Sequence, residues 1–172
     1  DPDNVPVRRE KFQYFERKFL TRDNGYWYYR DRRINVFAAV DFAFSLNRKA
    51  DYTAIVVVGV DGENNCYVID IDRFRTERIS DYFEHILNLH AKWSFRKIRA
   101  EVTVAQSAIV KQLKEMIKDH GLSLSIDEFR PSKSHGSKQE RISSTLEPRY
   151  DNLQIWHYKG GNIQILEEEL SS

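Results

Sequence analysis

The fold of this chain is decided at the stretch VFAAVDF, residues 36–42, where an apolar segment runs into an acid. Its pattern predicts a core strand over 35–42. Asp41 lies near the end of that strand, and a buried carboxylate is costly unless a cation or hydrogen-bond donors accompany it. A strand predicted over 97–102 contains a second acid, Glu101. Two acids on two core strands suggest a metal site.

Hydrophobic periodicity outward from this stretch predicts a mixed α/β chain. Further strands are predicted at 53–60, 66–74, 97–102, 122–129 and 153–157, with a hairpin turn at Asp61-Gly62. Helices are predicted at 10–20, from an N-cap at Ser80 to about His90, at 107–120 with Gly121 as cap, before Pro148, and at 163–170. The first three core strands form an antiparallel meander, and later helices cross over. This order predicts a mixed sheet with helices on both faces.

Composition limits the class of protein. A chain of 172 residues with 41% hydrophobic and 13% aromatic content predicts a single domain with a real core. No apolar run approaches the roughly 20 residues that span a bilayer, and the first residues do not resemble a signal peptide. Cys66 is the only cysteine, which excludes an internal disulfide and favours an intracellular setting. The net charge of +1 leaves nucleic-acid binding open.

The predicted topology brings the two acids together. A strand that returns through a helix can lie parallel to the first, about 4.8 Å away, and Asp41 and Glu101 each lie at the carboxyl end of a strand. Ligands of open α/β sheets bind at such ends, and paired carboxylates suit a hard cation such as Mg²⁺ or Mn²⁺. The alternative is structural: Asp41 caps a loop, and Glu101 pairs with Arg99 or a lysine.

These motifs resemble a known family. The order of elements, with acids on the first and fourth core strands, resembles the RNase H-like nuclease fold, and the local sequence is similar to the C-terminal nuclease domain of tailed-phage terminase large subunits. The resemblance covers nearly the whole chain from about Ile34. It is carried by VDFA at 40–43 with ADYTAI at 50–55, RAE at 99–101, Ser137-Lys138 with Arg141-Ile142, LEP at 146–148, and LEEEL at 166–170.

The resemblance implies an endonuclease that cuts concatemeric viral DNA by two-metal chemistry with two Mg²⁺ or Mn²⁺ ions. Asp41 would be the bridging ligand, and Glu101 would hold one ion. Asp51 is a further candidate ligand, with pairing to Arg48 or Lys49 as the favoured alternative. The family's third essential carboxylate is expected shortly after the helix at 163–170, past Ser172. Glu167, Glu168 or Glu169 could substitute for it, but a solvated helix face is the favoured expectation for these three residues.

The same resemblance implies an organisation and partners. Residues 1–33 would be an approach segment with a short helix that follows an ATPase domain, and 34–172 a nuclease domain that lacks its C-terminal end. The partners would be double-stranded DNA, that ATPase domain, a portal and a small terminase subunit. The isolated domain is expected to be monomeric, in the host-cell cytoplasm and without a membrane partner.

Basic residues flank the predicted site and favour DNA phosphates over a purely solvated loop. They are Lys133, His135, Lys138, Arg141, Arg48 and Lys49. A second basic patch, Arg73, Arg75 and Arg78, has no role assigned by its pattern. Two other functions stay open: a Holliday-junction resolvase or transposase-like nuclease, and a DNA- or protein-docking module whose acid site is incomplete.

Overall fold

The structure is a computed structural model of the chain, and it describes residues 13–42, 52–130, 155–157 and Glu167. The chain forms two compact units, which are described one at a time. The first, called here the helical unit, comprises 36–57 and 71–132. The second, called here the hairpin unit, comprises 1–35, 58–70 and 133–172. Three long strands have residues in both units: β4 (Arg32–Asp41), β5 (Thr53–Asp61) and β6 (Cys66–Phe74).

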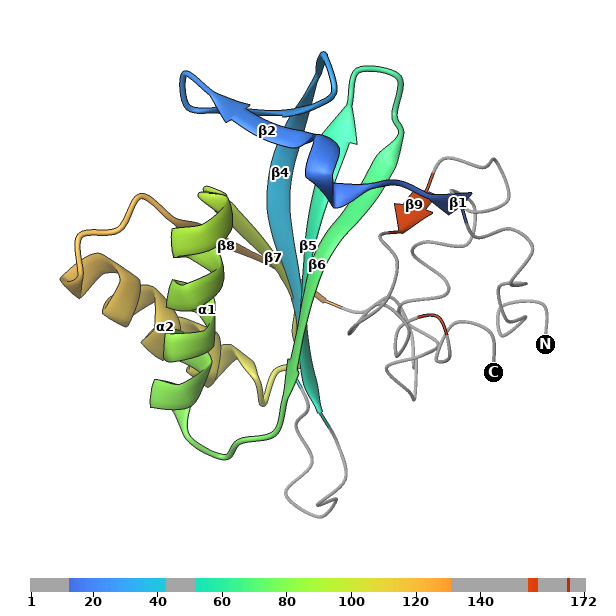
Figure 1. The fold of residues 1–172 in the computed structure, drawn as a ribbon. Coiled ribbons are helices and arrows are strands. Elements are labelled where there is room, and N and C mark those ends of the chain that lie inside the picture. The colour runs from blue at the N-terminus through green and yellow to red at the C-terminus, as the bar shows by residue number, and fades with distance from the viewer. Residues whose placement is uncertain (1–12, 43–51, 131–154, 158–166, 168–172) are drawn as a thin grey trace. The chain divides into compact units, whose positions relative to one another are not determined.

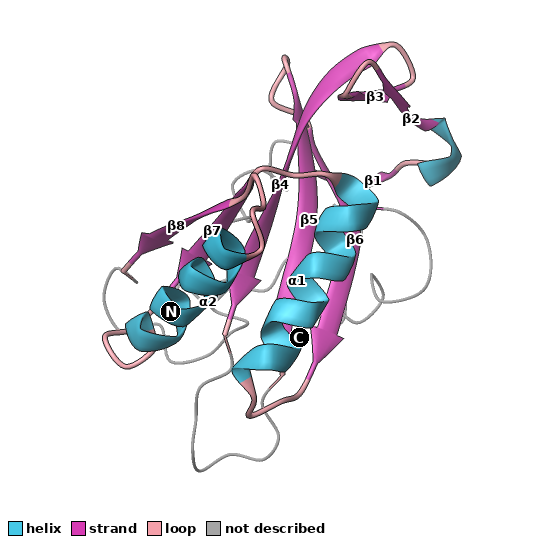
Figure 2. Cartoon of the chain, turned by 90° about the vertical axis from the view of Figure 1, so that its left-hand side faces the viewer, coloured by secondary structure: helices cyan, strands magenta, loops and turns pink. Residues whose placement is uncertain are grey.

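The helical unit is a sheet whose two described helices lie on the same face. After β6 come α1 (Ile79–Trp93), β7 (Lys97–Glu101), α2 (Ser107–Asp119) and β8 (Ser125–Phe129). The strand order here is β6-β5-β4-β7-β8, in which β7 runs parallel to both β4 and β8. Figures 1 and 2 show α1 and α2 over the same face of these strands. The crossovers predicted from sequence are therefore present.

Apolar spacing explains why both helices pack here. Buried positions recur every three or four residues, which is the period of an amphipathic helix. They are Tyr82, Phe83, Ile86, Leu89 and Trp93 on α1, and Val110, Leu113 and Ile117 on α2. Gly121 has φ +65°, which confirms its predicted place as the cap of α2.

The predicted N-cap of α1 is wrong. The helix begins at Ile79, with Arg78 at the cap position, so Ser80 lies inside the first turn. Thr76 Oγ1 donates to Asp81 Oδ2 at 2.6 Å and accepts a hydrogen bond from the Arg78 amide at 3.0 Å. These contacts tie the segment before α1 to its first turn, whereas the cap residue Arg78 makes no side-chain cap hydrogen bond.

The hairpin unit is built from short strands beside the other ends of β4, β5 and β6. These strands are β1 (Gln13–Tyr14), β2 (Leu20–Asp23), β3 (Tyr26–Tyr29) and β9 (Ile155–His157). The order within this unit is β1-β9-β6-β5-β4-β3-β2. Asn24 and Gly25 have positive φ in the turn between β2 and β3. The aromatic stretch at 26–29 forms β3.

The helix predicted over 10–20 is wrong in its described part. Residues from 13 onward form β1 and a single 3-10 turn, η3 (Arg17–Phe19). Phe15 is buried, with its ring edge-on to Tyr29 at 5.5 Å and to Tyr67 at 5.4 Å between centroids. This aromatic packing outweighs a helical pattern of only three phenylalanines.

The predicted mixed α/β class is confirmed, and each of the six predicted strands has a counterpart. The boundaries of β6 match the prediction, whereas β8 begins three residues later than expected. The helix expected before Pro148 lies outside the described residues, and of the helix at 163–170 only Glu167, which is helical, is described. No helix in the described part of the chain is long and apolar enough to cross a membrane.

Candidate functional site

The two acids singled out by sequence occupy paired positions in the sheet. Strands β4 and β7 are parallel neighbours, and the register pairs the Cα atoms of Asp41 and Glu101. Each is the last residue of its strand. The predicted juxtaposition at the carboxyl edge of the sheet is therefore observed for the backbone. The structure describes the backbone of Asp41 and not its side chain.

Alternation along the strands tells which face these positions belong to. Phe42 packs edge-on against Tyr82 of α1, with 5.5 Å between ring centroids. Ala100, the neighbour of Glu101, is fully buried, whereas Glu101 itself is half-buried. Positions 41 and 101 thus belong to the face opposite α1 and α2. Glu101 is half-buried because β7 has one buried and one accessible face.

Gln106 ties together the segments that follow the two acids, and sequence reasoning missed it. This side chain is buried; its Nε2 donates to the Phe42 carbonyl at 3.2 Å, and its Oε1 accepts from the Thr103 amide at 3.0 Å. Phe42 directly follows Asp41, and Thr103 lies two residues after Glu101. One amide side chain therefore fixes the ends of β4 and β7 relative to each other. The sequence itself shows only a glutamine directly before the helix predicted at 107–120.

The chemistry of the paired acids fits a hard divalent cation. Two carboxylates at paired positions on neighbouring strands repel each other, and a cation that both contact removes that repulsion. Carboxylate oxygens are also the preferred ligands of Mg²⁺ and Mn²⁺. Among the residues whose side chains are described, no group of three or more His, Cys, Asp or Glu side chains is placed to hold a metal ion.

Most of the other predicted site residues lie outside the described residues. These are Asp51, Arg48, Lys49, Lys133, His135, Lys138 and Arg141, and their roles stay predictions. Glu167 is described, and it corrects one expectation: it is helical but only 5% exposed, so it does not lie on a solvated helix face.

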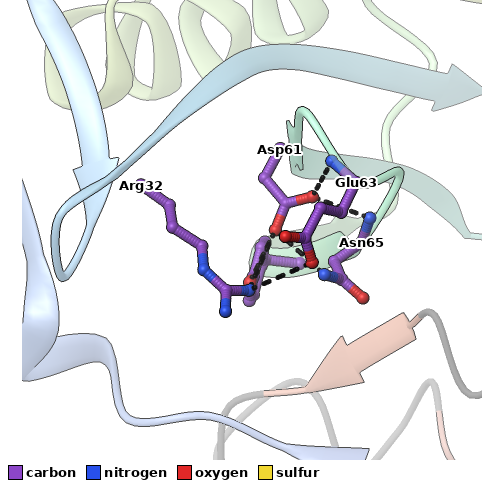
Figure 3. A network of polar contacts seen from close by, with 5 residues as sticks. Arg32, Asp61, Glu63 and Asn65 are labelled. Carbon is purple, nitrogen blue, oxygen red and sulfur yellow. Dashed lines mark hydrogen bonds and ion pairs between the residues drawn. The ribbon is translucent and has the colours of Figure 1, made fainter.

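A different acid, Asp61 at the end of β5, is enclosed by donors (Figure 3). Its Oδ1 accepts the backbone amides of Glu63 and Asn65, both at 2.9 Å. Its Oδ2 accepts Asn65 Nδ2 at 3.0 Å and the Tyr67 hydroxyl at 3.1 Å. Arg32 Nη1 adds an ion pair at 3.7 Å. The hairpin predicted at Asp61-Gly62 is thus held by the carboxylate itself.

The pKa values in this cluster follow from these contacts. Burial opposes ionisation of Asp61, but the hydrogen bonds from Asn65, the Glu63 amide and Tyr67 outweigh it and hold the pKa of Asp61 below its ordinary value. Burial, and then the adjacent Asp61 carboxylate, raise the pKa of Tyr67 to about 12. This acid is fully satisfied by its own surroundings, so it has a structural role.

Three histidines of the helical unit also have local partners. His85 Nδ1 lies 2.6 Å from Asp72 Oδ2, and its ring stacks on Phe74 with 3.7 Å between centroids. His90 and His120 place Nδ1 2.8 Å from the carbonyl oxygens of Phe95 and Met116, respectively. These contacts hold α1 and the end of α2 in place.

Comparisons with known proteins were made at the level of sequence and of structure. No family model and no curated protein sequence matches this chain. Solved structures do match. The large terminase nuclease from thermophilic phage G20c has a TM-score of 0.58 at 18% identity, over 94% of this chain and 76% of that one.

Two further structures agree. A mutant nuclease domain of the large terminase subunit of bacterial virus Sf6, solved with manganese and β-thujaplicinol, has a TM-score of 0.52 at 12% identity, over 80% of this chain and 70% of that one. The fowlpox virus Holliday junction resolvase has a TM-score of 0.50 at 12% identity, over 79% of this chain and 88% of that one. At these identities the likeness establishes the fold. The chain therefore has the RNase H-like fold, and its structural neighbours include the nuclease domains of phage large terminases.

Proposed function

We propose that this chain is a metal-dependent endonuclease domain of a viral DNA-packaging terminase, which hydrolyses phosphodiester bonds of concatemeric double-stranded DNA. The observation that carries the proposal is the register of two parallel strands that pairs Asp41 with Glu101 at their carboxyl ends. The shared fold with phage terminase nucleases supports it.

In this proposal the chain's own residues hold and orient the reacting groups. Asp41 and Glu101 would hold divalent ions through their carboxylate oxygens, and Asp51 would be a further candidate ligand. Bound ions of this kind lower the pKa of a water and stabilise the departing 3′-oxygen. Gln106 acts as a positioning residue, because it fixes the backbone on the C-terminal side of both acids.

The proposal extends to organisation and partners. Residues 1–33 would connect to an ATPase domain, and the full protein would work with a portal and a small terminase subunit in the host-cell cytoplasm. Lys133, His135, Lys138, Arg141, Arg48 and Lys49 would contact DNA phosphates without reading sequence.

Cleavage of supercoiled plasmid in Mn²⁺ tests the proposal. We expect nicking by the wild-type chain, or by a chain extended past Ser172 along its parent reading frame, and none by Asp41→Asn of the same length. Asn keeps the size of Asp41 but removes the charge that a metal requires. Cutting retained by Asp41→Asn would contradict the assignment, as would failure of both wild-type lengths to cut.

A resolvase is the second candidate, since the fowlpox enzyme shares the fold. The substrate discriminates between the two. A terminase nuclease should cut linear duplex and a four-way junction of the same sequences at similar rates, whereas a resolvase should cut the junction far faster. The parent reading frame gives an independent answer, because a Walker-type ATPase upstream of Asp1 favours the terminase.

A further inference from the structure

Two arginines and a tyrosine form a stack beside the paired acids. The guanidinium carbon of Arg73 lies 3.7 Å from the centre of the Tyr52 ring, and that of Arg75 lies 3.9 Å from the same ring. Arg73 comes from the end of β6, Arg75 follows it, and Tyr52 immediately precedes β5. We call these three residues the arginine–tyrosine stack.

The stack lies at the end of the sheet where β4 and β7 finish, as the two acids do. β5 and β6 are joined by a tight hairpin, so the end of β6 lies beside the start of β5. Figure 2 shows β4 and β6 ending at one edge, where β5 begins. In the order β6-β5-β4-β7, the end of β6 is two strands from Asp41. At the usual strand spacing this separation is about 10 Å.

The stack also shares a face with the acids. Thr53 Oγ1 donates to the Tyr82 hydroxyl on α1, and Phe74 stacks on His85 of the same helix. Their neighbours Tyr52 and Arg73 therefore belong to the face opposite the helices, as do positions 41 and 101. Asp72, the nearest acid along β6, is on the helix side and bonds to His85. The stack thus presents positive charge to the face that bears Asp41 and Glu101.

Stacking on the ring leaves these guanidinium groups well placed to bind a phosphate. An arginine that lies over an aromatic ring uses its flat face there and keeps its N–H edge for a bidentate acceptor. Within the described part of the chain Arg75 forms no ion pair with a carboxylate, whereas Arg78, from the same basic patch, pairs with Asp81 at 3.0 Å.

We infer that the arginine–tyrosine stack binds the phosphate backbone of DNA about two strand spacings from the cleavage site. The inference rests on the proposed nuclease function and assigns a role to a basic patch that sequence alone left without one. Tyr52 holds the two guanidinium groups in place, and Arg73 and Arg75 each contact a phosphate. The contacts position the duplex without reading its sequence.

Salt-dependent DNA binding tests the inference. A labelled short duplex is titrated with the chain at several NaCl concentrations, with Ca²⁺ replacing Mn²⁺ to prevent cutting. Each phosphate contact contributes about 0.9 to the slope of log K against log salt. Arg73→Gln/Arg75→Gln should therefore bind about tenfold more weakly at low salt, with a slope shallower by about 1 to 2.

A matched control removes two positive charges elsewhere. Arg78 is held by Asp81, and Lys111 is exposed on α2, on the helix side. Arg78→Gln/Lys111→Gln should leave the slope unchanged. Tyr52→Leu keeps both charges but loses the ring, so its affinity should fall about threefold while the slope is retained. Melting temperatures of all variants establish that each is folded.

The inference is overturned by an unchanged slope in Arg73→Gln/Arg75→Gln, by an equal change in the matched control, or by a wild-type chain that does not bind duplex DNA. Failure of the nuclease proposal looks different. If the wild-type chain binds DNA through the stack but neither responds to Mn²⁺ nor nicks plasmid, the phosphate contact stands and the nuclease proposal fails. If nicking depends on Asp41 and the arginine substitutions have no effect on DNA binding, the nuclease proposal stands and the phosphate contact fails.

Discussion

Asp61 and Asp41 each end a long strand of the sheet, but the residues that the fold places next to them differ. Asp61 accepts four hydrogen bonds from its own hairpin and an ion pair from Arg32. Asp41 is paired in register with a second acid, Glu101. The first carboxylate has its counter-charge built into the fold, whereas two carboxylates in register would gain from a shared cation. The role of an acid at a strand end therefore follows from the residues that the fold places beside it.

The largest expected difference is in stability without metal. Asp61→Asn replaces a charged acceptor of four hydrogen bonds, so we expect it to lower the free energy of unfolding by about 2–4 kcal/mol. Asp41→Asn relieves a like-charge pair and should leave stability unchanged or slightly raised. Urea denaturation in chelator compares the two. Equal destabilisation by both variants would remove the contrast between the acids.

Gln106→Ala should have an intermediate effect. Losing a buried amide that bridges two backbone groups is expected to lower the free energy of unfolding by about 1–2 kcal/mol. A positioning role adds a second effect, a weaker affinity for Mn²⁺, which calorimetric titration measures. Asp61→Asn serves as the control, since it should be destabilised without losing Mn²⁺ affinity. Unchanged affinity in Gln106→Ala would reduce Gln106 to a purely structural residue.

The smallest expected effect concerns Tyr67. Tyr67→Phe removes one hydrogen bond to Asp61 and should lower the free energy of unfolding by about 1 kcal/mol. Because the folded pKa of Tyr67 is raised, its contribution is present below the unfolded pKa of about 10 and is lost as pH rises toward 12. Ultraviolet absorbance should show one tyrosine ionising near pH 12 in wild type and absent in Tyr67→Phe. An unchanged titration would contradict the Asp61–Tyr67 contact.

Sequence predicted the sheet well where local pattern and topology agree. The alternation from Cys66 to Phe74 and the adjacent hairpin defined β6 fully. The pairing of Asp41 with Glu101 followed from crossover logic, because a helix returning the chain beside β4 leaves few registers that bury Ala38 and Ile98 together.

What sequence missed depends on contacts between distant residues. Gln106 carries no periodic signal, and its value comes from a carbonyl 64 positions earlier. The turn at Asp61 was predicted, but its enclosure by Tyr67 and Arg32 was not. Tyr52 lies next to a polar loop, and only the strand order shows that two arginines stack on it. Phe15 was assigned to a helix because its aromatic partners lie on other strands.

Binding of a divalent ion at Asp41 and Glu101 is the central proposal for this protein, and an Mn²⁺ titration of the melting temperature tests it most directly. The wild-type chain should melt at progressively higher temperature as Mn²⁺ is added, because an ion that binds only the folded state stabilises it. Asp41→Asn and Glu101→Gln should melt at least as high as wild type in chelator and show no rise with Mn²⁺. A flat wild-type response, or an equal rise in both variants, would contradict the metal site.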